Sequence, residues 1–281
     1  MDLGRERLEW SADIWKRIDD SVHDEFQRTS VAAKFIPLYS AIADTLTVPS
    51  DIIDSETMTI NEVAVTPLVE LSVEFGLTRQ QVGGEAQLST ALTLATRAAN
   101  LLSQGEDLAI FGGDEGLKAS PLKQVRQRGG NAGPGLLNAS DQAVQVTPVS
   151  AGAKNYGEHT FSSVAEAYSL LQSKGHYGPY ALALRSELYA DTFAPLPETL
   201  AMPADRIKPL VTLGLFGTGA LRPSTGVLVS VGGNSIDLVA AVDPITEFLQ
   251  VDVDGLYRFR VFERFAVRVK DNTAIVRLEF Q

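Results

Sequence analysis

Cysteine is absent from the 281 residues of the sequence. Its absence excludes disulfides, thiolate nucleophiles, iron–sulfur clusters and cysteine-ligated zinc. Histidine is scarce as well: the three residues His23, His159 and His176 match no zinc-binding spacing, and neither an HExxH nor a GxSxG sequence is present. The sequence therefore shows no recognisable metal centre and no nucleophile elbow.

Positive charge is in deficit, with 24 Lys and Arg against 35 Asp and Glu and a net charge of -11. Such a chain repels nucleic acid and anionic membranes. The longest uncharged stretches flank Arg222 and are too rich in Gly, Pro, Ser and Thr to span a bilayer. The first residues, MDLGRERLEW, are charged where a signal peptide needs an apolar core. We expect a cytoplasmic protein without nucleic-acid or membrane partners.

What is present is an ordinary globular composition, 44% apolar and 21% charged, long enough for one large or two small domains. The first element is an amphipathic helix over residues 11–29, with Ser11 as its N-cap. Its apolar stripe consists of Ile14, Ile18, Val22 and Phe26. Because the helix stands at the end of the chain, this stripe must pack on something later in the sequence.

The middle of the chain mixes strands and helices. Residues 40–66 predict an extended two-stranded ribbon, too polar to build its own core, whose natural partner is another subunit. The other expected elements are a strand at 67–77, a long helix at 85–111 stopped by Gly112 and Gly113, a helix at 161–174, a strand at 180–184 and a loop at 194–205. The glycine-rich segment 129–135 lacks the Lys-Ser/Thr of a P-loop and predicts a flexible surface loop.

The last quarter of the chain is strongly β. Residues 226–231 and 237–242 predict a hairpin through the turn at 232–234. Residues 257–269 alternate between apolar and charged, and with 276–280 they predict a second hairpin around Asp271 and Asn272. Helices and antiparallel strands are interspersed, so the fold class is α+β.

Catalysis has little support in the sequence. Acidic residues are common, but no pair is singled out by an apolar setting that would raise a pKa. A terminal amphipathic helix and a ribbon that cannot support itself favour an assembling protein over an enzyme.

Several segments, each weak alone, share their order and spacing with a known family. They are SADIWKRIDDSVHDEF, the KFI that follows, TPLVELSVEF, QGEDLAIFGG, GLL at 135–137, GHYGPYAL and YRFRVFERFAVRVKDNTAIVRLEF. Within them, Glu106, Asp107 and the pair Ile110–Phe111 are the most telling. Nearly end to end, the chain resembles the encapsulins, bacterial nanocompartment shell proteins also catalogued as linocin-like bacteriocins. It is most similar to the family 1 group, whose members begin with an amphipathic helix.

The resemblance implies the HK97-type fold of tailed-phage capsid proteins. Its implied parts are an N-terminal helix and arm on the shell interior at 1–39, an extended intersubunit loop at 40–66, a peripheral domain with the spine helix and the C-terminal strands at 67–135 and 234–281, and an axial domain at 136–233. It also implies a homo-oligomer of 60 or more copies around a cargo enzyme, a peroxidase or a ferritin-like protein, which carries a short targeting peptide.

Two sets of site residues follow from the resemblance. The groove for the cargo peptide would include Phe26, Ala33, Pro37, Ile245 and Phe248, where burial of apolar surface contributes about 25 cal/mol per Å². Alternatively, Phe26 and Phe248 only dock the helix onto the sheet. The loop at a fivefold pore would contain Pro195, Pro197, Glu198, Pro203 and Asp205.

The chain departs from the family pattern in three places. Ala33 and Pro37 stand where familiar members have a basic residue and an acid that help to hold the peptide, so charge recognition is lost and a more apolar peptide is expected. The run YSAIADTLTVP replaces a GPxG-like turn, so the extended loop starts differently. Residues 78–82 lack the tryptophan through which some members bind flavin, so no flavin is expected at that site.

Two alternatives remain at this point. A phage or prophage major capsid protein has the same fold, although the acidic balance and the absence of an N-terminal scaffold segment favour the shell. A hydrolase or bacteriocin is the other alternative, because family members have carried both labels, yet the sequence offers no nucleophile to support it.

Overall fold

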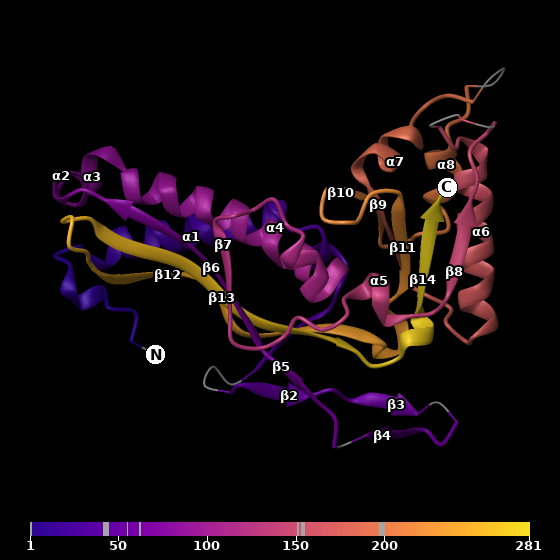
Figure 1. Cartoon of the computed structure of the whole chain (residues 1–281), viewed down its shortest axis with the longest axis horizontal. Coiled ribbons are helices and arrows are strands. Elements are labelled where there is room, and N and C mark those ends of the chain that lie inside the picture. Colours follow the sequence, from indigo (N-terminus) through magenta and orange to yellow (C-terminus); the bar gives the residue numbers. More distant parts are fainter. Residues whose placement is uncertain are drawn as a thin grey trace.

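The protein, seen in a computed structural model, is elongated: two sheets follow one another along its length and a narrow ribbon leaves the body (Figure 1). The structure describes residues 2–41, 45–54, 56–61, 63–150, 152, 155–196 and 200–281. Among them, no helix is long and apolar enough to cross a bilayer. The N-terminus lies beneath the first sheet and the C-terminus at the far end of the second.

The first sheet has five strands in the order β1-β12-β13-β6-β7. Their bounds are β1 Leu38–Ser40, β6 Val69–Leu77, β7 Val125–Arg128, β12 Ile236–Val251 and β13 Tyr257–Val269. β12, β13, β6 and β7 are successively antiparallel, whereas β1 runs parallel to β12 at the edge. The two long strands β12 and β13 form the axis of this part of the molecule.

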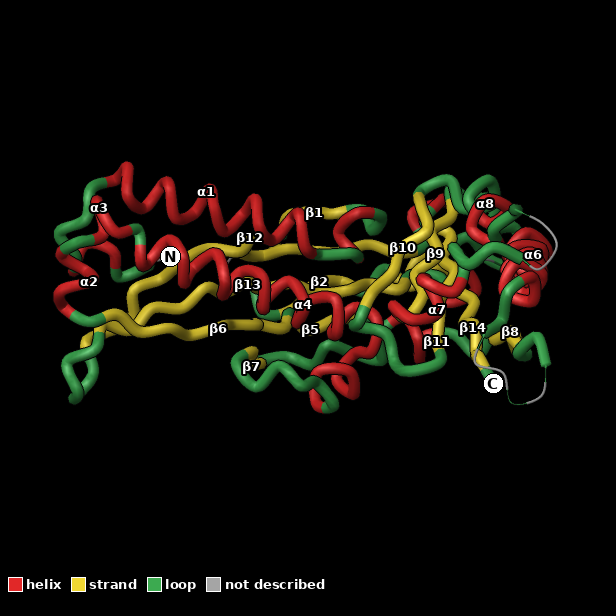
Figure 2. Tube along the Cα trace, turned by 90° about the horizontal axis from the view of Figure 1, so that it is seen from above, coloured by secondary structure: helices red, strands yellow, loops and turns green. Residues whose placement is uncertain are grey.

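Two helices cover one face of the first sheet, α1 (Ala12–Thr29) and α4 (Thr90–Lys118) (Figure 2). The N-terminal prediction is confirmed: the side chain of Ser11 accepts a hydrogen bond from the Ile14 amide. α1 buries the stripe Trp15, Ile18, Val22 and Phe26. The hydroxyl of Ser21 on α1 lies 2.7 Å from the hydroxyl of Thr96 on α4, and this hydrogen bond holds the terminal helix against the spine helix.

The prediction for the spine helix is wrong at both ends. Its start is divided into α2 (Arg79–Gly83) and α3 (Glu85–Leu88), separated from α4 by Ser89 with a positive φ of 51°. Gly113 also has a positive φ, 62°, and bends the helix without ending it. A Cβ there would lie 2.1 Å from the Gly133 carbonyl oxygen, so the glycine-rich segment, a largely exposed surface loop as expected, packs against the bend at Gly133.

The second sheet has its own core and its own helices. Its order is β10-β9-β11-β14-β8, with bounds β8 Ala143–Val146, β9 Tyr180–Arg185, β10 Gly214–Thr218, β11 Thr225–Ser230 and β14 Ile275–Phe280. The helices of this part are α5 Leu136–Ala139, α6 Glu158–Ser173, α7 Ser186–Asp191 and α8 Pro203–Ile207. Val164 and Leu171 of α6 pack on Leu182 and Leu228 of the sheet.

Both C-terminal hairpin predictions are wrong, because the chain crosses between the sheets at each predicted turn. β11 pairs with β9 and β14 in the second sheet, while β12 and β13 pair with each other in the first. The two crossings lie together: the amides of Lys270 and Asp271 donate to the Ser235 carbonyl at 2.8 and 3.1 Å. The alternation was right for each strand, but alternation carries no information on the partner strand.

The ribbon consists of four short strands, β2 Thr47–Pro49, β3 Ile52–Asp54, β4 Thr59–Asn61 and β5 Val65–Pro67. β2 pairs with β5 and β3 with β4, both antiparallel. Figure 1 shows the ribbon extending below the first sheet. Val48 of β2 is buried against Val239, Ala241 and Ala266 of that sheet. Other apolar side chains of the ribbon are open to solvent: Leu46, Ile52, Met58, Ile60, Val63 and Val65.

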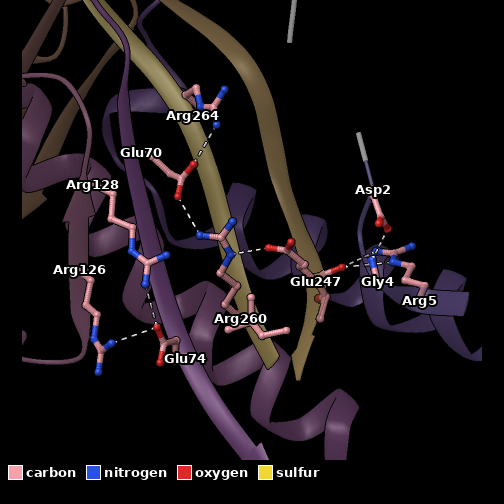
Figure 3. A network of polar contacts seen from close by, with 12 residues as sticks. Asp2, Gly4, Arg5, Glu70, Glu74, Arg126, Arg128, Glu247, Arg260 and Arg264 are labelled. Atoms are coloured by element: carbon pink, nitrogen blue, oxygen red, sulfur yellow. Dashed lines mark hydrogen bonds and ion pairs between the residues drawn. The ribbon is translucent and has the colours of Figure 1, made fainter. Parts of the chain in front are cut away.

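An arginine–carboxylate network covers the face of the first sheet opposite the helices (Figure 3). Arg260 of β13 donates to Glu70 of β6 at 2.7 Å and to Glu247 of β12. Arg264 donates to Glu70 at 3.0 Å. Arg260 is largely shielded from solvent and neutralises two partly buried carboxylates, of which Glu70 is shared with Arg264.

We expect Arg260→Ala to lower the free energy of unfolding by on the order of 3 kcal/mol, because it removes the cation paired with Glu247 and leaves Glu70 with Arg264 alone. The matched control is Arg126→Ala, which removes a solvent-exposed partner of Glu74 and should cost less than about 0.5 kcal/mol. Urea unfolding followed by the fluorescence of Trp10 and Trp15 measures both. Equal losses in the two variants would contradict a stabilising role for the network.

Candidate functional site

A hollow of about 320 Å³ lies between the last turns of α1 and strand β12. It is bounded by α1, the segment after it, one residue of α4, and strands β12 and β13. The lining residues are His23, Phe26, Gln27, Ala33, Ile36, Leu38, Glu106, Leu238, Ala240, Val242, Asp243, Pro244, Glu263 and Phe265. Apolar side chains make most of its walls, and three carboxyl groups lie among them, those of Glu106, Asp243 and Glu263.

A second hollow continues the first toward the middle of α1. The two share His23, Val242, Asp243 and Pro244. The second adds Asp19, Asp20, Asp24 and Ile245. We refer to the two hollows together as the groove. A continuous depression of this kind, apolar at its centre and acidic along one rim, is suited to an extended peptide.

A bulge in β12 opens the floor of the groove. Val242 pairs with Arg264 and Ile245 with Phe262, so two residues of β12, Asp243 and Pro244, stand opposite one residue of β13. Proline has no backbone N–H to donate to the ladder, which explains why pairing fails here. The bulge leaves the β13 residue between these pairs, Glu263, beside the groove.

The turn after α1 is held by one carboxylate of the spine helix. Asp107 accepts from the amides of Val31 and Ala32 at 2.9–3.1 Å. The hydroxyl of Ser30 donates to Glu106 at 2.9 Å and lies 3.2 Å from Asp107. These contacts fix the short helix Ala32–Lys34, and with it the groove wall at Ala33.

The carboxyl groups beneath the groove are buried, and their pKa values are displaced. Burial, reinforced by the charge of Asp107, raises the pKa of Glu106 to about 8. Burial also raises the pKa of Asp107 to about 6, against the opposing effect of its amide donors at Ala32 and Val31. The expectation that no acidic pair lies in an apolar setting is therefore wrong, because the apolar setting is built by segments far apart in sequence.

Glu263 completes this group from the sheet side. It is 3% exposed, and its Oε1 has no hydrogen-bond partner among the described residues. Burial raises its pKa well above the usual range, with further contributions from Glu106, Asp107 and Asp243. With a pKa of about 8, Glu106 is largely protonated near neutral pH, and the pKa of Glu263 is displaced in the same direction. No group of His, Asp and Glu in the described part of the chain is arranged to hold a metal ion.

The structure brings together only some of the residues expected at a cargo-peptide groove. Phe26 and Ala33 line its central hollow and Ile245 lines the second one. Pro37 lies between two lining residues, but its carbonyl accepts from the Leu238 amide at 2.9 Å. Phe248 lines neither hollow; it is buried in an aromatic cluster, 5.3 Å from the ring of Phe259. Its position matches the alternative in which it only supports the sheet.

Of the residues expected at a pore loop, Pro203 and Asp205 lie on α8, beside the second sheet. Pro197 and Glu198 fall outside the described residues. Pro195 is exposed. Pro203 is buried at the first position of α8, so the loop expected over 194–205 ends in a helix. Asp205 on that helix is half exposed and lies 3.8 Å from Lys208.

Sequence reasoning missed the floor of the groove. Glu263 falls in the same alternation as Phe259, Val261 and Phe265, which places it on the buried face of β13. Its place in this alternation indicates a buried acid from the sequence alone. Pro244 inside a strand pattern was a second signal, because it predicts a bulge. Their meeting with Glu106 of α4 depends on tertiary packing.

The raised pKa of Glu106 makes the stability of the protein depend on pH. Between its unfolded value near 4.5 and its folded value of about 8, the unfolded chain is ionised while the folded chain keeps the proton. The free energy of unfolding therefore falls as pH rises through this range, and Glu106 does not lower it below pH 4.5. Asp107 and Glu263, whose pKa values are also raised by burial at this site, act in the same direction.

We expect Glu106→Gln to raise the melting temperature at about pH 8 by several degrees and to leave it nearly unchanged at about pH 4.5. The matched control is Glu74→Gln, which removes a carboxylate from the opposite face of the same sheet and should not flatten the pH profile. Differential scanning calorimetry across this pH range is the measurement. An unchanged profile in Glu106→Gln would contradict the assignment.

The sequence matches the family described as "Encapsulating protein for peroxidase" over residues 1–266. It is 29% identical to the type 1 encapsulin shell protein EncA of Myxococcus xanthus over 188 residues. The aligned region covers 67% of this chain and 59% of that protein. A diheme-cytochrome-encapsulin shell fusion protein of Kuenenia stuttgartiensis is 24% identical over 281 residues, 94% of this chain and 72% of that one.

Among solved structures, the virus-like particle from Pyrococcus furiosus superimposes with a TM-score of 0.72 at 16% identity. This match covers 95% of the present chain and 100% of the other, so the two share the HK97-type capsid fold. The family match extends over nearly the whole sequence. The chain therefore belongs to the encapsulin family of shell proteins.

Proposed function

We propose that the chain assembles into a closed icosahedral shell of 60 or more copies that encloses a cargo protein in the cytoplasm. The cargo, a peroxidase or a ferritin-like enzyme, is recruited by a short peptide that occupies the groove beside α1. The shell itself is not an enzyme. Membership of a family whose relatives are named as shell proteins supports this function over a phage capsid, which shares only the fold.

The ribbon is the observation that carries the proposal. Met58 is 81% exposed, Leu46 75% and Val63 89%, and all three lie within about twenty residues. Unlike Val48, which packs on the first sheet, these side chains lie open on a thin projection, so they mark a contact with another molecule. A neighbouring subunit supplies this partner and also covers the short strand edges. The interface should reach the obligate class, on the order of 2,000 Å² or more.

Two further assignments belong to the proposal. The first sheet with its two helices forms the peripheral domain, and the second sheet forms the axial domain that meets the symmetry axes. The last strand, β14, pairs in the second sheet, so the axial domain includes the C-terminus. The tip around Pro195 and α8 faces the fivefold opening, where Asp205 is the exposed acid among the described residues.

The proposal is tested by electron microscopy and size-exclusion chromatography of the purified protein. Hollow particles of uniform size that elute in the megadalton range are expected. Ile60→Asp places a charge on the exposed apolar ribbon and should leave a folded protein that elutes as a small oligomer, because desolvating an unpaired carboxylate at an interface is costly.

Ala12→Asp is the matched control. It introduces the same charge at the exposed first turn of α1, where the helix dipole favours an acid, and should assemble like the original protein. Circular dichroism confirms that both variants are folded. A small oligomer from the unmodified chain, or intact particles from Ile60→Asp, would refute the role given to the ribbon.

A further inference from the structure

The carboxyl group of Glu263 is the one polar feature of the groove that the fold leaves incomplete. Its Oε1 is shielded from solvent and has no partner among the described residues, yet its side chain lines the hollow. Burying such a group without a hydrogen bond costs free energy, so an unsatisfied native group calls for an explanation. A ligand that reaches the floor of the groove would supply the missing partner.

The charges around the groove define the chemistry of that ligand. Asp19 and Asp20 are paired with Arg5 and Lys16, at 2.8 and 2.6 Å. Asp24 and Asp243 make no ion pair with any other described residue. The described residues that line the two hollows include acids and one histidine, His23, but no Lys or Arg. The groove thus combines a negative rim, a carboxyl floor and no cation of its own.

The walls above that floor are apolar. Phe26 and Ile36 stand on the helix side, and Leu238 and Phe265 stand on the sheet side. A group that passes between them to reach Glu263 needs an aliphatic stem and a donor at its tip. Lysine and arginine have this form, since both bury their methylenes while the charged end seeks an acceptor. The site is not suited to a bare metal ion.

We propose that the groove is a specificity pocket for a basic side chain: a cargo peptide that is otherwise apolar inserts one Lys or Arg, whose cation bonds to Glu263 and Glu106. This inference rests on the proposed function, because the occupant is taken to be the targeting peptide. The peptide is thus apolar with a single buried cation.

Binding of the cation is coupled to proton release. Glu263 faces Glu106 and Asp107 of α4, Asp243 of β12 and, across the groove, His23 of α1. Lys34 is the nearby cation, and it acts on Asp107. A lysine that enters this group stabilises the ionised carboxylate, so a proton leaves as the ion pair forms. The preference for a basic side chain therefore strengthens as pH rises from about 6 to about 8.

The test uses a fluorescent protein carrying ten-residue C-terminal tails drawn from Leu, Ile, Val, Ala, Gly, Ser, Lys and Glu, coexpressed with the full shell protein. Particles are isolated by size and the tails inside them are sequenced by mass spectrometry. We expect apolar tails with one Lys to be enriched about tenfold over tails with one Glu. In Glu263→Gln shells this enrichment should fall to near unity while enrichment of apolar positions persists.

Glu74→Gln is the matched control, since it removes a carboxylate from the opposite face of the sheet, and its shells should select the same tails as the original. A synthetic selected tail and its norleucine analogue then give the binding ratio at about pH 6 and pH 8. Enrichment of apolar tails without preference for Lys, or a preference that survives both Glu263→Gln and Glu106→Gln, would overturn this inference alone. Intact particles that enrich no tail would instead refute the recruitment part of the proposed function.

Discussion

The pairing of β12 with β13 is the interaction on which the rest of the structure depends. These two strands run antiparallel along the whole first sheet. β12 is preceded by β11 and β13 is followed by β14, both in the second sheet, and the two connections lie side by side. Asp237 lies fully buried at that junction and accepts from Arg268 and Lys270 at 2.7 and 2.6 Å. Because an unpaired buried charge is so costly, this group allows few alternative arrangements of the crossing strands.

The same pair of strands separates two environments. On one face, α1 and α4 bury the aromatic and aliphatic side chains; on the other, Arg260 binds carboxylates from both neighbouring strands. Alternation along β13 produces this division, since successive side chains point to opposite faces. Glu263 is the exception, a carboxyl group on the apolar face, and it stands where the bulge at Pro244 interrupts the pairing. The groove is therefore a consequence of a local failure in the sheet.

Local patterns predicted individual elements well and their partners poorly. The N-cap at Ser11 and the apolar stripe of α1 could be predicted because helix periodicity and capping are local. The strands at the C-terminus were found for the same reason. The predicted hairpins were wrong because the choice of partner depends on contacts across the whole chain. Gly113 misled the prediction in the opposite sense: a glycine that permits a bend was taken as a stop.

The groove shows the same limit. Phe26 and Ala33 could be assigned through the resemblance, whereas the meeting of Glu106 with Glu263 requires the packing of α4 on β13, which no local pattern contains. The family's shared residues already marked Glu106 and Asp107, but not their burial.

Two features of the isolated chain are unfavourable, and they have the same explanation. The ribbon exposes apolar side chains to solvent, and Glu263 has a buried carboxyl oxygen without a hydrogen-bond partner among the described residues. Each costs free energy in the single chain, and native proteins retain such costs mainly at functional sites. Under the proposed assembly, a neighbouring subunit would bury the apolar side chains of the ribbon, and under the proposed loading, a guest would donate a charged hydrogen bond to Glu263. Both proposals thus assign the removal of a local instability to a binding event.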